Sequence, residues 1–192
     1  MATEDVHEEC GVFGIYAPGE DVARLTYFGL YALQHRGQES AGIATADGEQ
    51  IRIHTQMGLV TTAFSEAELA RLTGHIAIGH TRYSTTGSSR QANAGPFLVH
   101  SPNGSIAVAH NGNLVNSGNL RQELADRGVH FAGTTDTEAL TWTIALGYAP
   151  DIVGRVREAM TRFVGAYSLA ILTENERVGE RGPPGIRPLR IG

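Results

Sequence analysis

Two pairs of short apolar runs, each joined by a tight turn, constrain the fold of this chain more than any other feature. Residues 41–55 contain two such runs around an Asp-Gly dipeptide at 47–48, and residues 98–109 contain two around an Asn-Gly dipeptide at 103–104. These dipeptides between apolar runs are the strongest short-range signal of a β-hairpin. Helical stretches separate and follow the hairpins, which is typical of an α+β protein with antiparallel sheets covered by helices.

The remaining elements follow from the spacing of apolar residues. Recurrence at helical spacing predicts helices, and short apolar runs predict further strands. Asp21 is expected to cap the first helix, and Ser65 with Glu68 forms a capping box for the second. The predicted helices cover residues 21–36, 65–72, 116–128, 138–146 and 152–163, and the further strands cover residues 12–16, 76–78 and 166–172.

The length and composition exclude several classes of protein. A chain of 192 residues with 41% hydrophobic residues is long enough for one domain with its own core. The net charge of −5 argues against nucleic acid as the main partner. No apolar stretch approaches the roughly 18 residues of a membrane span, and the acidic first nine residues lack the apolar core of a secretory signal. A cytoplasmic protein without nucleic-acid or membrane partners is expected.

Cys10 is the only cysteine in the chain, so no internal disulfide, multi-cysteine metal site or iron–sulfur cluster can form within it. We therefore expect no metal and no cofactor in this chain. The simplest interpretation of a lone cysteine is a small buried apolar residue. The second interpretation is a nucleophile, because Gly11 allows close approach to the backbone and several polar clusters lie downstream.

Three polar segments contain the candidate partners of such a nucleophile. They are residues 79–87, 110–113 and 134–138, and the first two directly follow predicted strands. Segments of this kind often carry ligand contacts. Each also has a simpler interpretation: the first could be an ordinary loop, Asn111-Gly112 a plain turn, and Asp136 the N-cap of the following helix.

Taken together, several segments in order resemble the glutaminase domain of amidophosphoribosyltransferases. They are residues 10–14, 26–30, 33–43, 79–85, 109–114 and 135–138. They include Cys-Gly-Val-Phe-Gly, His-Arg-Gly-Gln-Glu-Ser-Ala-Gly, Gly-His-Thr-Arg-Tyr-Ser-Thr and His-Asn-Gly-Asn. Any one segment is weak evidence, but the ordered set is highly specific. The resemblance implies a class II (type 2) glutamine amidotransferase domain over residues 10–192 with the N-terminal-nucleophile hydrolase fold, a four-layer αββα sandwich of two antiparallel sheets.

The resemblance also implies the catalytic roles. Cys10 would be the nucleophile that forms a thioester with the glutamine side chain, and its own α-amino group would be the base. A free α-amine has a pKa of roughly 7.7–8.0, whereas a peptide nitrogen is not basic. Asn111 through its side-chain amide and Gly112 through its backbone N–H would bind the oxyanion.

The two ends of glutamine carry opposite charges, and the resemblance assigns them to opposite partners. Arg82 would hold the carboxylate and Asp136 the ammonium. Arg36 carries over as a residue near the nucleophile, and Tyr83 and Thr85 as parts of the glutamine pocket. The chain is therefore expected to hydrolyse glutamine to glutamate and ammonia. A phosphoribosyltransferase domain or subunit would use the ammonia to form phosphoribosylamine in purine biosynthesis.

Two features depart from the family pattern. Residues 1–9 precede Cys10 and are expected to be a removable leader, although an acidic tail without a role is the simpler interpretation. Nothing here resembles a phosphoribosyltransferase domain, and Gly182 stands where the family usually has aspartate. We expect the domain to be partial at its C-terminus, with an uncovered sheet edge that favours self-association. The alternative function is therefore a catalytically inactive, truncated remnant or an interaction module of the same family.

Overall fold

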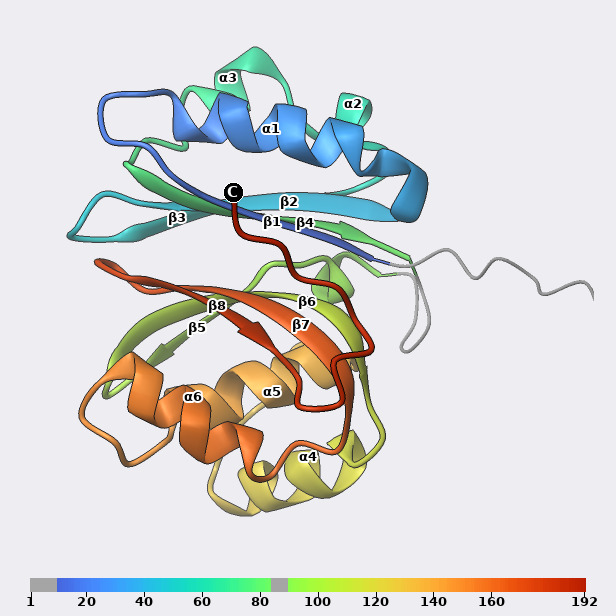
Figure 1. The fold of residues 1–192 in the computed structure, drawn as a ribbon, viewed down its shortest axis with the longest axis vertical. Helices are drawn as coiled ribbons and strands as arrows, with labels where there is room; N and C mark the ends of the chain where they lie inside the picture. The colour runs from blue at the N-terminus through green and yellow to red at the C-terminus, as the bar shows by residue number, and fades with distance from the viewer. Residues whose placement is uncertain (1–9, 84–89) are drawn as a thin grey trace, which may run out of the picture.

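Two antiparallel sheets lie face to face between two layers of helices (Figure 1). The structure is a computed structural model and describes residues 10–83 and 90–192. The predicted four-layer αββα sandwich is confirmed. Two parts of the sequence-based interpretation, the leader of residues 1–9 and Thr85, lie outside the described residues.

The first sheet contains β1 to β4 in the order β1-β4-β2-β3, and the second contains β5 to β8 in sequence order. Every pairing in both sheets is antiparallel. The strands of the first sheet are β1 (Gly11–Tyr16), β2 (Ser40–Ala46), β3 (Ile51–Met57) and β4 (Ile76–Arg82). Those of the second are β5 (Phe97–Ser101), β6 (Gly104–Leu114), β7 (Gly165–Leu172) and β8 (Arg177–Arg181).

The helices cover the outer faces of the two sheets (Figure 1). On the first sheet lie α1 (Val22–Ala32), α2 (Val60–Ala63) and α3 (Glu66–Leu69). On the second lie α4 (Ser117–Asp126), α5 (Asp136–Ala145) and α6 (Ile152–Met160). Short 3₁₀ helices follow α1 (Gln34–Arg36) and precede β5 (Gln91–Asn93). Among the described residues, no helix is both long enough and apolar enough to cross a bilayer.

Three buried clusters hold the four layers together. One lies under α1 to α3, a second under α4 to α6, and a third between the sheets. The third is built largely from small side chains, which lets the two sheets approach closely. Its buried members are Ala44, Ala46, Ile76, Ile78, Ala107, Ala109, Ala170 and Leu172.

The local signals in the sequence are largely confirmed. Both predicted hairpins form, Asp21 accepts a hydrogen bond from the Arg24 N–H, and the Ser65/Glu68 capping box is present. Two strands are longer than predicted, because β4 continues to Arg82 and β6 to Leu114. The polar residues in those extensions were expected to lie in loops, but paired neighbouring strands satisfy their backbone groups. The short α2 and the strand β8 were not predicted.

Glu180 of β8 is a buried carboxylate for which the described part of the chain offers no hydrogen-bond donor. Only 8% of the residue is exposed. It lies close enough to Tyr167 to raise the pKa of that phenol, although burial of the phenol is the larger cause. Burial also raises the pKa of Glu180 from 4.5 to about 7. The folded protein therefore keeps a proton that the unfolded chain releases at lower pH.

The fold should lose stability as the pH rises from 4.5 to about 7, because the unfolded chain releases the Glu180 proton in this range and the folded protein keeps it. The raised pKa corresponds to about 3 kcal/mol of unfolding free energy, which is lost across that range. Glu180→Gln cannot ionise, so it should be more stable than wild type by this amount at about pH 8 and equally stable at about pH 4. Urea unfolding at both pH values measures the difference. Glu176→Gln, at an exposed position just before β8, is the control. Equal stabilities of Glu180→Gln and wild type at the higher pH would contradict this prediction.

Candidate active site

One pocket brings together most of the residues that the sequence singled out. It lies where the first sheet meets the second, and both sheets and the first turn of α5 supply its walls. Its lining includes Cys10, Arg82, Tyr83, Gly112 and Asp136. The volume that solvent can enter is about 20 Å³, room for roughly one water molecule. A larger hollow of about 500 Å³ beside β1 and β8 has no cysteine, aspartate or glutamate among its described lining residues.

Polar contacts hold both the backbone and the thiol of Cys10. The residue directly precedes β1, whose pairing with β4 brings it to the end of β4, where it contacts Tyr83. The Tyr83 N–H donates to Cys10 Sγ at 3.5 Å, and Sγ in turn lies 3.6 Å from the Tyr83 carbonyl oxygen. Arg36 Nε donates to the Cys10 carbonyl at 3.3 Å. The nucleophile candidate therefore has a fixed position at the end of a strand.

The electrostatic surroundings of Cys10 keep its sulfur protonated. Burial raises the pKa of the Cys10 thiol, and this effect outweighs the lowering by the Tyr83 backbone and the Arg82 charge. The Asp136 carboxylate raises the pKa further. At neutral pH the group is a thiol, which is a weak nucleophile. Any reaction at this sulfur needs a base to take its proton.

Arg82, at the end of β4, is a buried cation paired with a carboxylate. Its Nη1 donates to Glu39 Oε1 at 2.9 Å, and the Glu39 N–H donates to the Arg82 carbonyl at 3.1 Å. Only 4% of Arg82 is exposed, and it lines the pocket. An arginine has several donors in a planar fork, and the ion pair with Glu39 orients this guanidinium at the wall of the pocket.

Asp136 is the first residue of α5, and its side chain points away from its own helix end. Its Oδ2 accepts the Leu114 N–H of β6 at 2.9 Å. The N-cap is instead Thr135, whose side chain accepts a hydrogen bond from the Glu138 N–H. The interpretation of Asp136 as an N-cap is therefore wrong. Its carboxylate joins α5 to the strand that carries Asn111 and still faces the pocket.

Two buried histidines in the pocket lining connect the two sheets. His80 of β4 contacts the His110 carbonyl of β6 through Nε2 at 3.0 Å. Burial, followed by the neighbouring His110, lowers the pKa of His80 to about 3, so the ring is neutral and its Nε2–H donates to the carbonyl. His110 Nδ1 lies 3.0 Å from Thr137 Oγ1. Burial lowers the pKa of His110, and the Asp136 charge opposes this effect.

Asn111 and Gly112 lie side by side on β6. The Asn111 side chain is buried and forms no hydrogen bond with the described residues. Gly112 lines the pocket with φ of 154°, and a Cβ there would collide with the Ala166 backbone. Only glycine fits this position, because a Cβ here would push against the paired strand β7. The interpretation of Asn111-Gly112 as a plain turn is wrong, because both residues belong to a strand paired with β7.

Several residues around the site were not predicted from the sequence to belong to it. They are Glu39, His80, Thr81, Asn93, His110 and Thr137. Most belong to the polar segments already singled out, so their position in those segments was the available signal. Asn93 had no such signal. Of the predicted site residues, Asn111 and Arg36 neighbour the pocket without lining it.

The fold and this pocket define a glutamine amidotransferase domain, and comparisons with known proteins agree. The family model described as "Glutamine amidotransferase domain" matches residues 80–192. The chain belongs to that family, which is a family of enzymes. Within it, the chain corresponds to the glutaminase domain of amidophosphoribosyltransferases.

The relatives that support this assignment are longer proteins. The amidophosphoribosyltransferase of Synechococcus elongatus is 53% identical over 187 residues, which are 96% of this chain and 38% of the relative. That of Bacillus subtilis is 44% identical over 188 residues, which are 97% of this chain and 39% of the relative. The chain thus spans less than half the length of these relatives.

Comparison with solved structures leads to the same family assignment. The structure titled as that of the allosteric regulatory enzyme of purine biosynthesis matches with a TM-score of 0.85 and 42% identity, over 92% of this chain and 38% of that one. The Bacillus subtilis glutamine phosphoribosylpyrophosphate amidotransferase, complexed with ADP and GMP, matches with a TM-score of 0.83 and the same identity and coverage. These relatives share the N-terminal-nucleophile hydrolase fold.

Proposed function

We propose that this chain hydrolyses glutamine to glutamate and ammonia at the pocket around Cys10. The observation that supports the proposal is the placement of opposite charges around the only cysteine. Arg82 and Asp136 line the same pocket as Cys10, and each acts on the pKa of its thiol, in opposite directions. An amino acid bound with its carboxylate at Arg82 and its ammonium at Asp136 is held at both ends, which leaves its side-chain amide for the thiol. Glutamine is larger than one water molecule, so its binding requires the side chains that line this small pocket to move apart.

The proposed reaction begins with attack of the Cys10 sulfur on the carboxamide carbon. The α-amino group of Cys10 takes the thiol proton and then passes it to the departing ammonia, leaving a glutamyl thioester. Asn111 and Gly112 stabilise the oxyanion of the tetrahedral intermediate. Water then cleaves the thioester with the same amine as base. Glutamate leaves and the thiol is restored.

This mechanism requires a free amino group on Cys10. In the translated chain that nitrogen belongs to the Glu9–Cys10 amide and cannot accept a proton. We propose that residues 1–9 are removed in two steps. The Cys10 sulfur attacks the Glu9 carbonyl carbon, the Glu9–Cys10 C–N bond breaks, and the thiol proton ends on the released α-amino group. Water then hydrolyses the resulting thioester, which frees the Glu9 carboxylate and restores the thiol. The raised pKa of the thiol makes the base essential, because little thiolate is present without one.

The proposed fate of the ammonia follows from the relatives. They are amidophosphoribosyltransferases and extend well beyond the matched region. A phosphoribosyltransferase domain or subunit would therefore accept the ammonia to form phosphoribosylamine for purine biosynthesis.

Self-association of the isolated chain also stays a prediction, and sedimentation velocity over a range of concentrations checks it.

The direct test of the proposal is a glutaminase assay on the purified chain. Glutamate and ammonia should appear in equal amounts, and the intact mass of the same sample shows whether residues 1–9 have been lost. Absence of turnover in a protein that begins at Cys10 would overturn the proposal. It would favour the alternative, an inactive remnant or an interaction module of the same family.

Removing either charged partner should raise KM for glutamine at least about tenfold, because one charged end of the substrate is then left unpaired. The variants are Arg82→Ala and Asp136→Asn. The asparagine keeps an oxygen for the Leu114 N–H while losing the charge. Steady-state kinetics measure KM, and the thermal midpoint shows whether the fold is intact. Arg90→Ala, at an exposed position, is the control. Unchanged glutamine kinetics in both variants would exclude the assigned roles.

A further inference from the structure

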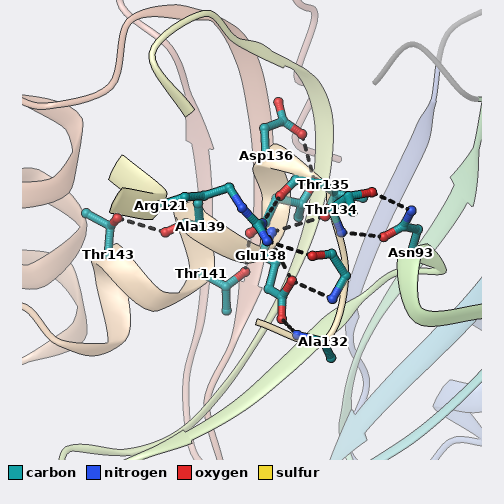
Figure 2. A network of polar contacts seen from close by, with 12 residues as sticks. Asn93, Arg121, Ala132, Thr134, Thr135, Asp136, Glu138, Ala139, Thr141 and Thr143 are labelled. Carbon is teal, nitrogen blue, oxygen red and sulfur yellow. Dashed lines mark hydrogen bonds and ion pairs between the residues drawn. The ribbon is translucent and has the colours of Figure 1, made fainter. Parts of the chain in front are cut away.

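The segment that leads into Asp136 is fixed by side chains from three different elements. Its residues 132–135 have no helix or strand of their own, yet Thr135 and Asp136 line the pocket. A backbone without regular structure must find other hydrogen-bond partners when it is buried. Here Asn93, Arg121 and Glu138 supply them (Figure 2).

Glu138 and Arg121 hold the backbone from the side of the helices. Glu138 accepts the Ala132 N–H at 2.7 Å and the Gly133 N–H at 2.9 Å, one on each carboxylate oxygen. Arg121 donates to the Gly133 carbonyl at 2.6 Å and to the Thr135 carbonyl at 3.0 Å. The two side chains also face each other, with Nη1 and Oε2 separated by 3.7 Å. They form one charged clamp around the segment.

Asn93 holds the same segment from the side of the pocket. Its Nδ2 donates to Thr134 Oγ1 at 3.0 Å, and its Oδ1 accepts the Thr134 N–H at 2.9 Å. The residue is 1% exposed and lines the pocket. A Cβ on Gly133 would collide with the Asn93 side chain, so the two backbones lie as close as glycine allows. The segment is thus gripped between Asn93 and the clamp.

We infer that Asn93 and the Arg121–Glu138 clamp are positioning residues for Asp136, and that through it they set the preference of the pocket for amides that carry an α-ammonium group. This inference rests on the proposed function. Asp136 follows the gripped segment directly, and a charged contact loses much of its strength when its geometry shifts by about 1 Å. Arg121 and Glu138 do not line the pocket, so they act on the substrate only through the segment that they hold.

The test compares glutamine with glutaramate, which has the same carboxylate and carboxamide but hydrogen in place of the α-ammonium group. The ratio of kcat/KM for the two amides measures the ammonium contact alone. Asp136→Asn should bring the ratio close to one. Asn93→Ala and Arg121→Met should lower it about tenfold through KM for glutamine, while kcat/KM for glutaramate stays near the wild-type value.

Arg121→Lys is a milder second variant in case the first ones unfold. Lysine keeps the positive charge beside Glu138 but has no planar fork for two carbonyls, so the ratio should still fall. Arg127→Met is the matched control, because Arg127 follows the same helix and donates to the Leu146 carbonyl outside this network. It should leave the ratio unchanged.

Two results would overturn the inference while leaving the proposed function intact. One is an unchanged ratio in folded Asn93→Ala and Arg121→Lys proteins. The other is an equal loss of activity on both amides, which marks a purely structural role. A wild-type chain that does not hydrolyse glutamine, or an Asp136→Asn protein with an unchanged ratio, would overturn this inference together with the assignment of the ammonium site.

Discussion

Cys10→Ala should abolish glutamine hydrolysis and leave residues 1–9 attached to the chain. Both effects follow from one missing sulfur, because the proposed mechanism uses it first on the Glu9 carbonyl and later on the glutamine carboxamide. Loss of a nucleophile that forms a covalent intermediate costs on the order of 10⁶ in kcat in well-studied hydrolases, so no turnover should be detectable. Intact mass and a glutaminase assay on the same sample measure the two effects.

The fold should tolerate this change. Cys10 is only partly buried, and the polar contacts of its backbone with Arg36 do not need the sulfur. A thermal midpoint close to that of wild type would show that the loss is chemical. A variant in which Cys10 directly follows an initiator methionine is the complementary control. It should be active once that methionine has been removed.

Two outcomes would refute this account of Cys10. An active protein that retains residues 1–9 would exclude the α-amino group as the base, since its nitrogen would still be an amide. Normal turnover by Cys10→Ala would exclude the sulfur as the nucleophile. The second result would leave Cys10 with the simpler interpretation of a small, partly buried residue.

The hairpins and most helices were predictable because their signals are local, whereas the four-layer sandwich was implied by the family resemblance. The hairpins depend on Asp-Gly and Asn-Gly turns, and the capping box on two residues of one helical turn. The ends of β4 and β6 were not predictable in this way. Gly79 to Arg82 contain polar side chains that suggest a loop, but β4 is paired with β1 on one side and β2 on the other. Pairing on both sides outweighs local preference.

The site was only partly predictable for the same reason. Cys10, Arg82 and Asp136 come from motifs that can be seen in the sequence, and the structure places them around one pocket. Glu39 contacts Arg82, and Asn93 contacts Thr134, and each pair is widely separated along the chain. No periodicity connects such pairs, because the contact depends on how two sheets and a helix pack. The position of Glu180, which has no hydrogen-bond donor in the described part of the chain, could not be predicted either, since burial of a carboxylate depends on the three-dimensional packing.

Asn111→Ala should lower kcat for glutamine by about 10²–10³-fold, the usual cost of losing one oxyanion-hole donor. The substitution should hardly affect KM, because the donor acts on charge that develops only in the transition state. It should also hardly affect folding. The Asn111 amide forms no hydrogen bond with the described residues, so its removal leaves no protein partner there unpaired.

Asn116→Ala is the contrasting control on the same stretch of chain. The Asn116 side chain donates to the Arg162 carbonyl at 2.8 Å and accepts the Val164 N–H at 3.1 Å, so it fixes the connection between two elements. Its loss should cost about 1–3 kcal/mol of stability and leave kcat unchanged. Steady-state kinetics and urea unfolding on both variants separate the two roles. If Asn111→Ala instead lost stability and kept its kcat, Asn111 would be a structural residue of β6, and the oxyanion would need another donor.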